Sequence, residues 1–201
     1  MAGLRASPDS MTELNDAELK AVGSRTAAEL ANELEAGTAS LLGELGDDGT
    51  RGVQFFGMTH SVAGVGGLML GEVLVHGRDL AKTIAQDWPT SGDQAVAIMS
   101  GVVPTLANFA DPDVAARATG VYHLKLRGGP EWTIAVRNGE VSVAPGKPPR
   151  ADLHISAEPV ALMLNGYGRI SQARVLASGK IVGWGGKPWL ALQFRKLFTE
   201  R

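Results

Sequence analysis

The first half of the chain places its apolar residues at the spacing of amphipathic helices. Between residues 25 and 45, leucines recur at helical spacing among Ala and Glu, which are strong helix formers. Either Ser24 as an N-cap or a capping box from Thr26 to Glu29 begins this helix. The same spacing predicts further helices at residues 16–22, 59–85 and 92–110, the last kinked or broken at Pro104.

The predicted helix at residues 59–85 is rich in glycine in its first half. Gly64, Gly66, Gly67 and Gly71 all fall inside it. Each glycine in a helix interior costs about 1 kcal/mol relative to alanine. Such a cost is tolerated where another helix or a ligand comes close to the backbone. The pattern therefore predicts a close contact along this part of the helix.

In the second half, apolar and polar residues alternate, which is the period of half-buried strands. Asn138-Gly139 is a strong signal for a tight hairpin between two of them. His123 and His154 fall on the polar side of the alternation, which predicts exposure to solvent. Strands are predicted at residues 121–127, 131–137, 140–144, 151–156 and 179–184, and helices at residues 159–165, 171–176 and 188–199.

The two halves together predict an α+β chain, with an all-α region at residues 1–112 and an α+β domain at residues 118–201. The first four strands follow one another along the chain, so the sheet is expected to be antiparallel, with helices on one face and solvent on the other. The last predicted helix carries an apolar stripe suited to covering the sheet.

The amino-acid composition argues against several classes of function. The 201 residues include 19 basic and 21 acidic side chains, for a net charge of −2, and no basic stripe that would bind nucleic acid. There is no cysteine, which excludes disulfides and thiolate metal ligands and fits a reducing compartment. No apolar run approaches the ~20 residues of a membrane span, and residues 1–10 lack the apolar stretch of a secretion signal. We therefore expect a cytoplasmic protein without stable membrane insertion.

Three segments of the second half, in order, resemble the sterol carrier protein type 2 family. They are residues 132–141, residues 151–166 and residues 178–185. The resemblance implies a sheet and helices that enclose an apolar ligand such as a fatty acyl chain or a sterol. The candidate ligand-binding residues are Trp132, Ile134, Leu162, Met163, Ile170, Leu190, Phe194 and Phe198. Because protein interiors are closely packed, plain core is the favoured interpretation of each of these residues taken alone, and it is the family resemblance that favours ligand binding.

Residues 71–81 resemble the signature helix of the mycothiol-dependent maleylpyruvate isomerase family, whose members join a DinB-like helical bundle to a sterol carrier-related domain. Glu72 and His76 are i, i+4 neighbours on one helix face, a pair suited to Zn²⁺ or another divalent metal. The resemblance implies a metal that activates the thiol of mycothiol or the substrate. The family's upstream histidine ligand has no counterpart here, because His60 is the only earlier histidine. A plain intrahelical pair is the competing interpretation.

Two functions follow from these resemblances. The first is binding of a lipid or other small apolar ligand by the C-terminal domain. The alternative is a metal-requiring isomerase or thiol transferase that uses mycothiol, with an incomplete metal site of Glu72, His76 and His60 on a shortened DinB-like region. A third interpretation is a structural or regulatory partner that binds neither. A bundle short of helices leaves apolar surface uncovered, which favours a homodimer.

Overall fold

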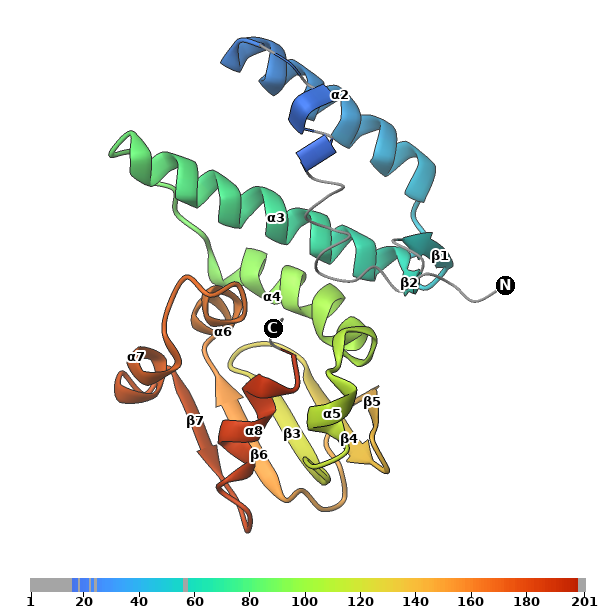
Figure 1. Cartoon of the computed structure of the whole chain (residues 1–201), viewed down its shortest axis with the longest axis vertical. Coiled ribbons are helices and arrows are strands. Elements are labelled where there is room, and N and C mark those ends of the chain that lie inside the picture. The colour runs from blue at the N-terminus through green and yellow to red at the C-terminus, as the bar shows by residue number, and fades with distance from the viewer. Residues whose placement is uncertain (1–15, 18, 22, 24, 56–57, 199–201) are drawn as a thin grey trace. The chain divides into compact units, whose positions relative to one another are not determined.

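The computed structural model describes residues 16, 17, 19–21, 23, 25–55 and 58–198 (Figure 1). The predicted α+β class is confirmed, with helices leading and a helix-covered sheet following. The chain divides between residues 62 and 63 into two compact units. The second unit therefore contains the sheet and also helices that the sequence analysis placed in the region 1–112. The predicted boundary between residues 112 and 118 stays a prediction. None of the helices in the described part is long and apolar enough to cross a membrane.

In the first unit, helix α2 (Ala27–Leu45) begins at the predicted capping box. Thr26 Oγ1 accepts a hydrogen bond from the Glu29 N–H at 3.2 Å, and the Glu29 carboxylate accepts one from the Thr26 N–H at 2.7 Å. The helix ends at Gly46, whose φ of 65° favours glycine. Residues 16, 17 and 19–21 of the predicted helix 16–22 are helical, while Ser24 and the rest of that helix lie outside the described residues.

A short hairpin follows α2, where the sequence predicts the start of a helix. Strand β1 (Gly52–Phe55) pairs antiparallel with β2 (Met58–Ser61), and helix α3 (Val62–Thr83) begins directly afterwards. The predicted helix start at residue 59 is therefore wrong. Strands of four residues are too short for a period of two to be distinguished from the edge of a helical pattern.

Helix α3 is approached closely at two of the four glycines that the sequence analysis named, Gly67 and Gly71. A Cβ atom on Gly67 would lie 2.8 Å from the Cα of Gly101 in helix α4 (Gly92–Val102), where the two helices cross. A Cβ atom on Gly71 would collide with the Tyr167 hydroxyl. The glycines thus admit a second helix and an aromatic side chain against the backbone of α3.

After α4 the chain forms a 3₁₀ helix, η1 (Val103–Phe109), and then the short helix α5 (Pro112–Ala115). Pro104 occupies the first turn of η1. Its missing N–H and fixed ring prevent the α-helical pattern from continuing, so the predicted break at this residue is confirmed.

The sheet of the second unit has the strand order β5-β4-β3-β6-β7. Its strands are β3 (Gly120–Leu126), β4 (Glu131–Arg137), β5 (Glu140–Pro145), β6 (Leu153–Ala157) and β7 (Ile181–Trp184). Neighbouring strands are antiparallel except for β3 and β6, which run parallel at the centre. The sheet is therefore mixed, which corrects the expectation of a wholly antiparallel one.

The parallel pair follows from the path of the chain after β5. That strand is at one edge of the sheet, while β6 lies beyond β4 and β3. Residues 146–152 must therefore cross two strands before β6 begins, and we call them the crossing segment. Strands joined by tight turns are antiparallel, whereas a crossing connection lets the next strand run parallel to an earlier one.

Helices α4, α6 (Pro159–Gly166) and α8 (Leu190–Lys196) pack on one face of this sheet, and α7 (Gln172–Ala177) leads into β7 (Figure 1). Every second residue of β3 and β4 points into this contact, as predicted. The buried residues of these two strands include Tyr122, Leu124, Leu126, Trp132, Ile134 and Val136. Helix α8 is shorter than the predicted helix 188–199.

Candidate functional site

The eight predicted ligand-binding residues come together on the helix-covered face of the sheet. They belong to one apolar cluster, contributed by β4, α6, the segment after α6 and the region of α8. Four of them are buried: Trp132, Ile134, Met163 and Leu190. The other four are partly buried and pack against the first: Leu162, Ile170, Phe194 and Phe198. Their role as a ligand lining stays a prediction, because the same side chains contact one another as core.

Helix α8 lies directly on β3 in this cluster. The Phe194 ring is 5.2 Å from that of Tyr122, and a Cβ atom on Gly120 would lie 2.7 Å from Leu190 Cδ1. A hydrogen bond of 2.8 Å from the Asp111 N–H to the Leu197 carbonyl holds the residue that follows the helix in place. What this face offers chemically is a large apolar surface under a short helix.

One polar atom is buried beside this surface. Among the described side chains, Gln193 Oε1 on α8 is enclosed and has no hydrogen-bond partner. An unsatisfied buried acceptor costs about 1–3 kcal/mol. A ligand that brought a hydroxyl or carboxylic acid to this atom would recover that free energy.

The two predicted metal ligands on α3 do meet. His76 Nε2 lies 3.0 Å from Glu72 Oε2, with the side chains 66% and 49% exposed. His60, the third candidate, is buried in β2 of the first unit, against the edge of Phe55. Within the described part of the chain, no group of three or more His, Asp or Glu side chains is placed to hold a metal ion. The metal site stays a prediction.

Asp79, one turn along the same helix, has a different partner. Arg169 donates to its carboxylate through Nε at 2.8 Å and Nη2 at 2.5 Å. These hydrogen bonds are the main reason why the pKa of Asp79 is lowered. The ion pair ties α3 to the segment after α6 and so stabilises the contact between helices.

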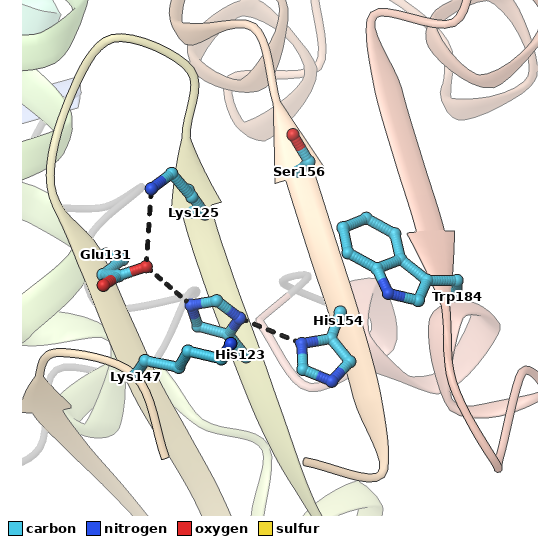
Figure 2. Close-up of a pocket in the computed structure, with 7 residues that line it drawn as sticks. All are labelled: His123, Lys125, Glu131, Lys147, His154, Ser156 and Trp184. Atoms are coloured by element: carbon cyan, nitrogen blue, oxygen red, sulfur yellow. Dashed lines mark hydrogen bonds and ion pairs between the residues drawn. The ribbon is translucent and has the colours of Figure 1, made fainter. Parts of the chain in front are cut away.

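The opposite, open face of the sheet holds a hollow of about 560 Å³ that we call the open-face pocket. Strand alternation builds it, because side chains next to the buried residues of β3, β4 and β6 point away from the helices. Figure 2 shows the residues that line it: His123, Lys125, Glu131, Lys147, His154, Ser156 and Trp184.

Two rows of paired residues form the floor of this pocket. In the first row, Trp184 of β7 pairs with His154 of β6, which pairs in turn with His123 of β3. The second row consists of Ser156, Lys125 and Glu131. Lys147 comes from the crossing segment, which starts on this face, since Thr133 Oγ1 donates to the Gly146 carbonyl at 2.9 Å.

Two hydrogen bonds and an ion pair connect four of the residues that line the pocket: His154, His123, Glu131 and Lys125. Glu131 Oε2 lies 3.0 Å from His123 Nε2 and 3.6 Å from Lys125 Nζ, and His123 Nδ1 lies 3.0 Å from His154 Nδ1. The His154 ring stacks on Trp184 with centroids 5.4 Å apart. His123 is only 6% exposed, so its predicted exposure is wrong. The alternation predicted the correct face of the sheet for His123, but it could not predict the neighbouring residues that enclose the ring.

These contacts determine the charges in the pocket. The pKa of Glu131 is lowered, first by the hydrogen bond with His123 and then by the charge of Lys125. Burial is the main cause of the lowered pKa of His154, and repulsion from the charge of Lys147 adds to it. At neutral pH the pocket therefore holds one carboxylate, two ammonium groups and a neutral imidazole at His154.

Residues 105–199 match the model of the SCP-2 sterol transfer family. The matched region contains most of η1, α5, the whole sheet and helices α6 to α8, so this part of the chain is similar to a sterol carrier-type domain. Domains of this family bind lipids or other apolar ligands. The match begins at Thr105, and the DinB-like character of the preceding region stays a prediction.

Solved structures that match part of the chain come from several sources. Sterol carrier protein 2 like 2 from Aedes aegypti is 17% identical, with 53% of this chain and 99% of that chain covered and a TM-score of 0.43. Sterol carrier protein domain 2 of Helicoverpa armigera is 18% identical, with 54% and 89% covered and a TM-score of 0.43.

A larger protein also contains a similar part. The stereoselective inverting sec-alkylsulfatase Pisa1 from Pseudomonas sp. is 16% identical, with a TM-score of 0.44 over 56% of this chain. The alignment covers only 17% of the sulfatase chain. No curated protein matches the sequence.

Proposed function

We propose that residues 105–199 bind a lipid or another small apolar molecule between the sheet and helices α6 and α8. The observation that supports this most directly is the family match, which spans the sheet and both helices. The apolar cluster under α8 supplies the chemistry, because it combines buried residues with partly buried ones at its margin.

The hydrophobic effect supplies the binding free energy. An acyl chain that loses about 400 Å² of exposed apolar surface gains about 10 kcal/mol. Part of this gain is used to displace side chains that now touch one another, chiefly Phe194 and Phe198 of the α8 region. Helix α8 has seven residues and Leu192 on it is 64% exposed, so the helix packs on the sheet with one side only.

A fluorescent fatty acid titration tests this proposal. We expect saturable binding to the wild-type chain, and binding at least fivefold weaker for Phe194→Ala, because the ring contributes about 1–3 kcal/mol of apolar contact. Leu192→Ala is the matched control: it shortens an apolar side chain of the same helix that points to solvent, and should leave affinity unchanged. Solvent extraction with mass spectrometry would identify any lipid that copurifies.

Two outcomes would count against apolar ligand binding. One is the absence of saturable binding to the folded wild-type chain. The other is that Phe194→Ala and Leu192→Ala weaken binding of the fatty acid equally. This result would place the probe on an exposed surface instead of between helix and sheet.

The alternative function, a mycothiol-dependent isomerase or thiol transferase, rests on α3. The contact between Glu72 and His76 is the structural feature that favours it. A metal there would activate a thiol as a Lewis acid. Stoichiometric divalent metal in the purified protein is what this hypothesis requires.

A further inference from the structure

We propose that the open-face pocket is a second binding site, which takes a small organic anion with an oxyanion group joined to a flat apolar body. The pocket lies on the face of the sheet that the helices leave open, whereas the apolar cluster lies under α8. The proposal is therefore independent of the lipid-binding function.

The balance of charge favours an anion over a cation. Lys125 and Lys147 bring two positive charges to the pocket, and Glu131 brings one negative charge. That carboxylate is already engaged by His123 and Lys125. Lys147 reaches over the floor from the crossing segment, as Figure 2 shows, and repels a proton on His154. A metal ion beside these ammonium groups would meet the same repulsion.

The hydrogen-bond chain presents His154 to such a ligand. The Glu131 carboxylate only accepts hydrogen bonds, so His123 Nε2–H donates to it. When Nε2 carries the single proton of the His123 ring, His123 Nδ1 accepts from His154 Nδ1–H, which leaves the lone pair on His154 Nε2. When an anion arrives, His154 takes one proton from solvent and donates Nε2–H to the oxyanion, as a charge-assisted hydrogen bond.

Size and surface indicate that the anion has an apolar body. A volume of about 560 Å³ falls within the range of small-molecule sites, roughly 300–1,000 Å³, and exceeds that of an oxyanion alone. Trp184, at the margin of the pocket, stacks on His154 with one face and is 53% exposed. Its indole ring offers a flat apolar surface for stacking.

Isothermal titration calorimetry on the full chain, in 150 mM salt, tests the proposal with benzoate and phenyl sulfate. Both probes keep one negative charge between pH 6 and pH 8. We expect saturable binding of at least one of them, several-fold tighter at pH 6 than at pH 8, with uptake of a proton. Acetate, which lacks the flat body, should bind more weakly, and uncharged benzyl alcohol should not bind.

Two substitutions connect the binding to the pocket. Lys147→Ala should weaken binding about tenfold, the effect of one charge-assisted hydrogen bond. Lys196→Ala removes an exposed lysine from α8 and should have no effect. His154→Gln should remove the pH dependence while keeping the fold, which circular dichroism checks.

Three results would overturn the proposal. The first is that neither probe binds the wild-type chain. The second is that Lys147→Ala and Lys196→Ala weaken binding equally, which shows general attraction to positive charge. The third is saturable binding of Zn²⁺ that His154→Gln abolishes while the anions fail to bind, since the histidine pair would then be a metal site.

Discussion

His154 lies between Trp184 and His123, in a position where its neutral form is favoured. Burial and the positive charges around it lower its pKa in the folded chain. The unfolded chain keeps a value near 6.5. The unfolded state therefore binds this proton at a higher pH than the folded state does.

This difference predicts a dependence of stability on pH. The contribution of His154 to the free energy of unfolding is fully present above pH 6.5 and is lost as the pH falls below it toward the folded pKa. Urea titrations at pH 7.5 and pH 5.5 should show a smaller loss of stability for His154→Gln than for wild type. His60 also has a lowered pKa but is unchanged in both proteins. Equal losses in the two proteins would contradict the prediction.

The histidines also show which contacts between residues the sequence can reveal. Glu72 and His76 were predicted to meet because they are one helical turn apart, and they do. The contact between His123 and His154 joins residues 31 positions apart on parallel strands. Alternation predicted that both rings leave the apolar face, but nothing local in the sequence gives the register between distant strands.

At the scale of elements, the crossing of α3 and α4 depends on a pair of glycines. Gly67 and Gly101 leave the two backbones so close that a Cβ atom on either would overlap the other helix. Gly66, the preceding residue of α3, has nothing within 4 Å of the place where a Cβ would lie. Two adjacent glycines of one helix thus have opposite surroundings.

Alanine substitutions should separate these two glycines. Gly67→Ala should lower the free energy of unfolding by about 1–3 kcal/mol, because the methyl group overpacks the helix crossing. Gly66→Ala should raise it by up to about 1 kcal/mol, because alanine favours the helix. Chemical denaturation of both variants measures the difference. A stability gain in both would mean that α3 and α4 do not cross at Gly67.

Periodicity predicted the long elements well and the short ones poorly. Strands β3 and β4 and helix α2 each show their period over several repeats, and their positions are confirmed. The hairpin of β1 and β2 was missed, because four residues give at most two repeats of a strand pattern. The parallel pairing of β3 with β6 was missed for another reason, since it depends on where the crossing segment leads.

At the scale of the whole molecule, the region that matches the sterol transfer family and the compact unit that contains it have different extents. The family match begins at Thr105, whereas the unit begins at Ala63. Helix α4 lies between these two points and sends Ala95, Ile98 and Met99 into the core of the sheet domain. The core is thus completed by residues that precede the family match.

Two fragments test where the stable domain begins. The fragment 63–201 should fold with a stability close to that of the second unit in the full chain, because it keeps α4. The free energy of unfolding of the fragment 105–201 should be lower by more than about 3 kcal/mol, because the burial of Ile98 and Met99 alone contributes that much. Thermal unfolding of both fragments gives the comparison, and equal stability would show that α4 is dispensable.

Three leucines of α2 are exposed in the first unit: Leu30, Leu34 and Leu42. A homodimer would cover them, and that homodimer stays a prediction.

The position of β6 also affects how the chain reaches its native state. Strands β3, β4 and β5 are joined by short turns and can pair soon after synthesis, but the place beside β3 stays empty until the chain has returned across the sheet. During that interval β3 presents unpaired backbone groups along the middle of the future sheet, where a strand from another molecule could add. We therefore expect newly made chains to be most prone to aggregate before β6 has paired with β3.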